Sequence, residues 1–379
     1  MDFDRLASTL RLTTMAAVVF GSAALAAQAS QTPGARLEAP ASQAAGSRLR
    51  APANQRSTPV ARSPKPEASN SPKPEARKWS PARTPWGDPD LQGAYTNKDE
   101  NGIPMERPSQ FQGKTIDQVQ QSELDDIVRQ RQQDATERAP GIGGAETGAG
   151  PVHWYEYYAA KNSRPWLIVD PADGKIPTLT PEAQQRAAAL SAARQGRGES
   201  DSAADRSLYD RCITRGVPGS MMPVIYGNSY QIVQGPGFVA IRYEMIHETR
   251  VIPLDGRPHV DKELRLYMGD PRGRWDGNSL VVETTNFNGR MSADIVGYGS
   301  PDRGASQQLR IVERFTPVNP TTLEWSVTLD DARTWTRPWT FAMKLTKDDT
   351  QSVYEYACHE GNYGLSNILS AARAEEKSR

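Results

Sequence analysis

Alternating apolar and polar positions dominate the chain from residue 222 onward. In residues 322–330 one face carries only apolar side chains, namely Leu323, Trp325, Val327 and Leu329. Such alternation is typical of half-buried strands. Strand-like runs recur at 222–226, 229–234, 237–247, 249–254, 279–287, 308–316, 322–330, 338–346 and 352–358. Turn residues separate these runs, so the pattern predicts a mainly β fold, either an antiparallel β-barrel or a barrel-like meander.

The pattern differs on both sides of these strands. Residues 78–210 predict an extended and helical arm that packs on the barrel, with helices at 115–138 and 181–194 and a short strand at 166–169. A Gly-rich stretch at 139–151 lacks the Gly-Lys-Ser/Thr ending of a phosphate loop, so we expect an ordinary loop there. The stretch 362–376 predicts a C-terminal helix, which completes the expected domain 211–379.

The first 77 residues predict no folded domain. Arg5 and Arg11 precede an apolar run and the small residues Ala27 and Ala29, as in a secretory signal peptide covering 1–29. The alternative is an N-terminal anchor helix, but the run is shorter than the roughly 20 residues that a membrane span needs. Residues 30–77 are rich in Pro, Ala and Ser, which predicts a disordered tether. No later segment is apolar enough to span a bilayer, so the chain is expected to be periplasmic or secreted.

Composition narrows the classes of partner. Lys and Arg together number 45, and so do Asp and Glu, which makes the net charge zero. A nucleic-acid-binding protein needs a basic face that displaces counterions, and docking on an anionic membrane needs a similar one. We therefore expect neither partner. The sequence leaves the oligomeric state open.

Two cysteines, Cys212 and Cys358, make up the whole complement. In an exported protein an even number favours a disulfide. The bond would close a loop of about 145 residues and stabilise the fold by up to roughly 4–5 kcal/mol in the chain-entropy model. Two free thiols, or a cysteine nucleophile, are the alternatives.

The same alternation singles out two candidate catalytic residues. In 237–247, His247 shares its face with apolar residues such as Val239 and Ile241, and in 308–316 Glu313 does the same. An inward carboxylate must be paired or its pKa rises. His247 and Glu313 are therefore a candidate acid/base pair inside the barrel. The alternative is a structural role, for example Glu313 paired with Arg250.

Further candidates flank this pair. Arg250 and His259 follow the strand and are candidate substrate-binding residues, as is His153 in an aromatic patch. The segment after Cys358 supplies His359 as a third catalytic candidate, with Glu360 and Asn362 as substrate-binding residues. No His-Glu-x-x-His pattern occurs, so we predict no cofactor and no metal ligands, although four histidines leave a divalent metal possible on weak evidence.

Several long motifs occur in order, namely PWGDPDLQG, RCITRG, YEMIHETRVIPLDGRPH and YACHEGNY. In these motifs the chain resembles a family of uncharacterised exported bacterial proteins over about 79–373. That family implies export but no reaction and no catalytic residue. The stretch WDGNSLVVETTNF is also similar, more weakly, to the meander of lipocalin-type barrels, which would imply a ligand cavity.

Three functions fit these observations. The first is a hydrolase or lyase that acts on a small glycoside, an aromatic compound or a polysaccharide fragment through His/Glu acid-base chemistry. The second is a non-catalytic periplasmic protein that binds an apolar or aromatic ligand. The third is a structural envelope protein. A small-molecule or saccharide ligand is the partner expected for the first two.

Overall fold

The computed structural model describes residues 79–137, 164–224, 226–290, 305–350 and 352–378. All of them belong to one compact unit, Lys73–Arg379. The expected signal peptide and tether, the Gly-rich loop 139–151 and His153 lie outside the described residues. The strands are β1 (Gly93–Thr96), β2 (Ile168–Asp170), β3 (Ser229–Gly235), β4 (Phe238–Tyr243), β5 (Thr249–Pro253), β6 (Asp270–Asp276), β7 (Ser279–Thr285), β8 (Arg310–Asn319), β9 (Thr322–Asp330) and β10 (Trp339–Lys347).

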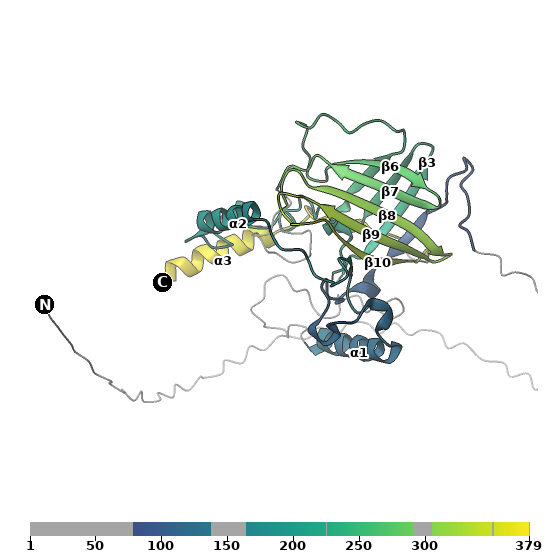
Figure 1. The fold of residues 1–379 in the computed structure, drawn as a ribbon. Coiled ribbons are helices and arrows are strands. Elements are labelled where there is room, and N and C mark those ends of the chain that lie inside the picture. Colours follow the sequence, from purple (N-terminus) through teal and green to yellow (C-terminus); the bar gives the residue numbers. More distant parts are fainter. Residues whose placement is uncertain (1–78, 138–163, 225, 291–304, 351, 379) are drawn as a thin grey trace, which may run out of the picture. The chain divides into compact units, whose positions relative to one another are not determined.

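The strands form one antiparallel sheet that curls into a nearly closed barrel (Figure 1), as the alternation predicts. The hydrogen-bonded order is β5-β4-β3-β1-β10-β9-β8-β7-β6, and β2 pairs with the start of β10. The ends of this path, β5 and β6, meet without backbone hydrogen bonds between described residues. Gly273 of β6 lies there against Ile252 and Leu254, where a Cβ would be 2.5 Å from Leu254 Cδ2. The two strands can approach each other this closely because glycine has no side chain.

Large apolar side chains fill the barrel interior. The register of β9 against β10 pairs Leu329 with Trp339 and Trp325 with Met343, so their inward faces interlock. All four side chains are essentially inaccessible to solvent. Trp325 also stacks on Phe315 at 6.3 Å between ring centroids. The alternation predicted for 322–330 and 338–346 is confirmed, and the interior is a packed core.

The two ends of the barrel differ. At one end, the hairpin end, the pairs β3–β4, β6–β7 and β8–β9 are joined by short turns. At the other end, here called the loop end, the chain enters β3, turns from β4 to β5, and runs from β7 to β8 and from β9 to β10. Long connections therefore gather at one end, where barrel proteins usually place their binding groups.

Among the described residues, the α-helices are α1 (Gln121–Glu137), α2 (Pro181–Arg194) and α3 (Gly364–Ser378). The prediction for α2 matches its bounds, because Thr180 caps it through a hydrogen bond from the Ala183 N–H and Pro181 occupies its first turn. α3 matches its expected helix within two residues, whereas α1 begins six residues later than the expected helix 115–138 and ends one residue before it. No helix among the described residues has the length and apolar character to cross a membrane.

Other predicted strands were wrong. Described residues of 222–226 and all of 352–358 are irregular, and the run 237–247 is a strand only to Tyr243. β6 was not predicted, because its sequence, DPRGRWD, contains a proline and a glycine and lacks alternation. β1 was also missed, although it completes the sheet by pairing with both β3 and β10.

Candidate functional site

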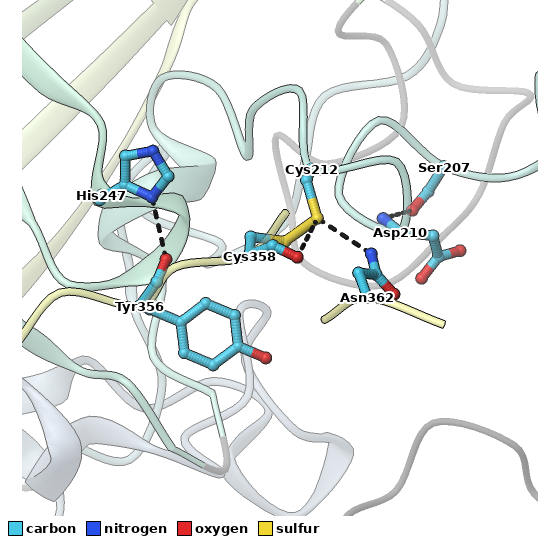
Figure 2. Close-up of a disulfide and its surroundings, with 7 residues drawn as sticks. All are labelled: Ser207, Asp210, Cys212, His247, Tyr356, Cys358 and Asn362. Atoms are coloured by element: carbon cyan, nitrogen blue, oxygen red, sulfur yellow. Dashed lines mark hydrogen bonds between the residues drawn. A yellow bond between two sulfur atoms is a disulfide. The ribbon is translucent and has the colours of Figure 1, made fainter. Parts of the chain in front are cut away.

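His247 does not point into the barrel, contrary to the prediction from strand alternation. β4 ends at Tyr243, and the chain then folds into a short 3-10 turn, Met245–His247, in which Ile246 and His247 have φ values of 61° and 49°. Left-handed backbone breaks the alternation, and at a β-branched residue such as Ile246 it is strained. His247 is exposed, and its Nδ1 lies 3.0 Å from the Tyr356 carbonyl oxygen (Figure 2).

Glu313 does point inward, and it is paired with Arg250, which is the structural role given as the alternative to catalysis. Its carboxylate is fully buried and forms an ion pair with Arg250 from β5. Trp325 Nε1 donates to Glu313 Oε1 at 3.2 Å, and Arg250 Nη2 donates to Thr284 Oγ1 at 3.2 Å. A carboxylate held in this way is sealed from solvent. The expected His247–Glu313 acid/base pair is therefore not formed.

This interior network crosses the seam between β5 and β6. Burial acts to lower the pKa of the Arg250 guanidinium, but the charge of Glu313 and the Tyr243 phenol raise it above its usual value. Burial, together with the Glu313 charge, raises the pKa of Tyr243 to about 12. Among the described residues, Arg250 Nε and Nη1 are buried without a hydrogen-bond partner. The network thus links β5 to β8 by an ion pair inside the barrel, on either side of the seam where the barrel closes.

His259 lies apart from His247 and Glu313. Its Nδ1 is 2.9 Å from Asp270 Oδ2, and its Nε2 is 3.6 Å from Glu283 Oε1. Arg272 forms a further ion pair with Asp270, at 2.8 Å. Within the described ranges no hydrogen bond or ion pair of this network reaches His247 or Glu313. It ties the connection before β6 to the outer face of the sheet.

The predicted disulfide is present and organises the loop end. Cys212 and Cys358 are joined, with their Cα atoms 5.6 Å apart (Figure 2). Asn362 Nδ2 lies 3.2 Å from the Cys212 sulfur. His359 and Glu360 are exposed on the turn that precedes α3. The structure therefore brings His247 and Asn362 to the region of the disulfide, whereas Arg250 and Glu313 are inside the barrel and His259 is on its outer face.

Three tyrosines beside the disulfide are a feature that the sequence analysis missed. Tyr209, Tyr226 and Tyr356 are all partly buried, and the phenol of Tyr226 is hydrogen-bonded to those of Tyr209 and Tyr356. The rings of Tyr226 and Tyr356 are 6.4 Å apart. Burial is the main cause that raises the pKa of Tyr209 and that of Tyr356, the latter to about 12. The hydroxyls therefore stay protonated and can donate hydrogen bonds at neutral pH.

A guanidinium group completes this tyrosine cluster. Arg215 stacks over the Tyr209 ring, with its Cζ 5.6 Å from the centroid. Its Nη2 donates to the Met222 carbonyl oxygen at 3.4 Å, while its buried Nη1 has no partner among the described residues. Leaving a buried donor without an acceptor costs free energy. A ligand that accepts a hydrogen bond from this donor would therefore bind more tightly.

Glu248 is a second group that was not predicted. It is the first residue after the strained turn, and its Oε2 accepts a hydrogen bond of 2.7 Å from Thr214 Oγ1. Burial raises the pKa of its carboxyl above the usual value, against the opposing effects of Thr214 and His247. Thr214 precedes Arg215, so Glu248 is connected to the segment that carries the tyrosine cluster.

No three His, Cys, Asp or Glu side chains gather in a metal-binding arrangement in the part of the chain that the structure describes. His259 with its two carboxylates is the nearest approach to such a group, and its ring nitrogens face those carboxylates. Nothing in this geometry adds weight to a divalent metal.

Comparisons with known proteins show no family for this chain. No protein-family model and no curated protein matches it. One solved structure, a secretary abundant heat soluble (SAHS) protein from Ramazzottius varieornatus, is 12% identical with a TM-score of 0.21. That match covers 38% of this chain and 87% of the other protein. At this TM-score the likeness carries no argument, and membership of the exported bacterial family stays a prediction.

Proposed function

We propose that this protein is an exported, non-catalytic binding protein that holds a saccharide at the tyrosine cluster. The observation that carries the proposal is the set of three partly buried, hydrogen-bonded phenols beside the unpartnered Nη1 of Arg215. Aromatic faces stack on the apolar faces of sugar rings, while phenol and guanidinium donors meet sugar hydroxyls. The disulfide fits the oxidising compartment that the predicted signal peptide implies.

A saccharide fits better than the apolar ligand considered from the sequence. An apolar ligand of a barrel protein needs an internal cavity. Here the inward side chains of the described strands interlock, and the interior charges are clamped to each other. Binding is therefore expected at the loop end, where the available surface combines aromatic rings with hydrogen-bond donors.

The test is a titration with neutral oligosaccharides in which binding is detected by tyrosine-selective NMR and by calorimetry. Tyr226→Phe removes the hydroxyl that links the cluster and should weaken binding by about tenfold, which corresponds to one hydrogen bond of roughly 1–1.5 kcal/mol. Tyr354→Phe is the matched control, because Tyr354 is 72% exposed on the same segment as Tyr356. If no saccharide binds, or both variants weaken binding equally, the proposal fails, and the filled barrel then favours the structural envelope role.

One observation keeps the enzyme hypothesis open at a different residue. The raised pKa of the Glu248 carboxyl is the property of a general acid. A hydrolase acting on a bound glycoside would use Glu248 to protonate the leaving group. Turnover of aryl glycosides that is abolished by Glu248→Gln and retained by His247→Ala would support this second function; turnover that survives Glu248→Gln would exclude it.

A further inference from the structure

A recess of about 230 Å³ lies on the outer face of the barrel, and no residue of the tyrosine cluster lines it. Val353 forms part of its wall and belongs to the irregular segment 352–358, here called the strap. The strap is held to the barrel because Arg242 Nη1 donates to the Val353 carbonyl at 3.0 Å and Cys358 is bonded to Cys212. The recess is lined by Ala94, Tyr95, Thr96, Lys98, Ser229, Asp348 and Val353.

Strand register places two hydroxyls on the floor of this recess. Thr96 of β1 lies directly opposite Ser229 of β3. Their neighbours Tyr95 and Tyr230 are also opposite each other and point into the core, so Thr96 and Ser229 point outward. The methyl group of Ala94 and the side chain of Val353 supply apolar surface beside them. The floor thus offers hydrogen bonds together with a small apolar contact.

Opposite charges stand at the walls without being paired to each other. Lys98 takes part in none of the ion pairs formed by described residues, although Lys347 nearby is paired with Asp349 at 3.2 Å. Asp348 uses Oδ1 to accept from the backbone N–H of Thr350 at 3.2 Å, and from its hydroxyl. Its Oδ2 accepts no hydrogen bond from the residues that the structure describes. Each wall therefore retains capacity for a ligand of the opposite charge.

We propose that the recess binds a small zwitterion such as an α-amino acid. The ligand carboxylate would meet the Lys98 ammonium, and the ligand ammonium would meet Asp348 Oδ2. The hydroxyls of Thr96 and Ser229 would satisfy remaining polar atoms, and a short side chain would lie against Val353. A recess of this size is below the roughly 300–1,000 Å³ of sites for drug-sized ligands, which suits a molecule with few heavy atoms.

The first arm of the test varies the ligand on the unmodified protein. Glycine and L-alanine are titrated at millimolar concentration while backbone amide shifts are followed by NMR. Shifts confined to Ala94, Thr96, Asp348 and the strap are expected. N-acetylalanine lacks the ammonium group and alanine methyl ester lacks the carboxylate, so each should bind about tenfold or more weakly, as expected for a lost charge-assisted hydrogen bond. No shift at these amides, or equal binding of alanine and N-acetylalanine, would overturn the proposal.

The second arm varies the protein. Lys98→Met should abolish the preference for alanine over its methyl ester, and Asp348→Asn the preference for alanine over N-acetylalanine. Lys98→Arg keeps the charge and should restore binding, which separates a loss of contact from a loss of fold. Lys262→Met changes an exposed lysine elsewhere and is the matched control. In the absence of alanine, Lys98→Met should leave saccharide binding unchanged, so this site and the saccharide site can fail independently.

Discussion

Removing one partner of the Arg250–Glu313 pair should lower the free energy of unfolding more than any substitution on the surface. Arg250→Met leaves the Glu313 carboxylate at 0% exposure, and among the described residues only the Trp325 indole still donates to it. Stranding a buried charge costs roughly 3–5 kcal/mol. That is a large share of the roughly 5–15 kcal/mol by which domains are stable. Replacing both partners, as in Arg250→Met with Glu313→Leu, removes the charge and should cost far less than the single change.

The assay is equilibrium urea unfolding followed by tryptophan fluorescence, since Trp325 contacts the pair directly. Wild type, each single variant and the double variant form a double-mutant cycle. We expect a coupling energy of about 2 kcal/mol or more between the two sites. Single variants that cost less than about 1 kcal/mol, the value typical of exposed pairs, would refute the reasoning that this pair is desolvated. So would a double variant whose cost equals the sum of the singles.

Three further predictions use the same unfolding assay. Replacing Cys212 and Cys358 by alanine should lower the free energy of unfolding by up to about 4–5 kcal/mol, because the disulfide spans a sequence separation of 146; an unchanged midpoint would show that the loop is otherwise fixed. Glu248→Gln should stabilise the fold at neutral pH but not at acid pH, because a carboxyl whose pKa is raised on folding loses stability as the pH rises above its unfolded value; equal effects at both pH values would contradict this. Gly273→Val should destabilise by about 1–3 kcal/mol, because a Cβ there would be 2.7 Å from Ile252 Cγ2; a neutral result would mean that the seam between β5 and β6 can widen freely.

Alternation predicts the strands that carry a regular two-sided pattern and fails where the backbone changes. Residues 322–330 and 338–346 have one buried and one solvated face, so their pattern follows directly from their packing. β6 is different, because its position at the end of the sheet needs a glycine for close approach and tolerates a proline. Its sequence consequently reads as a turn.

The candidate site was harder to predict, for two physical reasons. The alternation argument for His247 assumes that the backbone stays extended up to that residue. Ile246 breaks this assumption, because it has a positive φ, which no sequence rule anticipates at a β-branched residue. The same argument succeeded for Glu313, whose strand is unbroken. Strand alternation shows that a carboxylate points inward, but it does not show which cation pairs with it. Arg250 reaches Glu313 only because the barrel closes.

The tyrosine cluster did leave a signal in the sequence, and the disulfide is the key to it. Tyr209 precedes Cys212 by three residues, and Tyr356 precedes Cys358 by two. Once these cysteines are paired, the two tyrosines must lie near each other, which the predicted disulfide already implied. His359 and Glu360, on the other side of Cys358, are exposed instead. Proximity to the bond therefore selected a region correctly, but not the residues within it.

Both proposed sites use residues of the strap, so we expect binding at one site to affect binding at the other. The strap supplies Tyr356 to the tyrosine cluster and Val353 to the recess, and its hydrogen bond from the Tyr356 N–H to the Glu244 carbonyl lies between the two. A ligand that orders the strap at one site reduces the entropy cost of ordering it at the other. Any such coupling is reciprocal, so alanine and a saccharide should strengthen each other's binding by the same factor. Reduction of the Cys212–Cys358 bond would free one end of the strap and should weaken both. Two affinities that respond differently to reduction would show that the strap acts at one site alone.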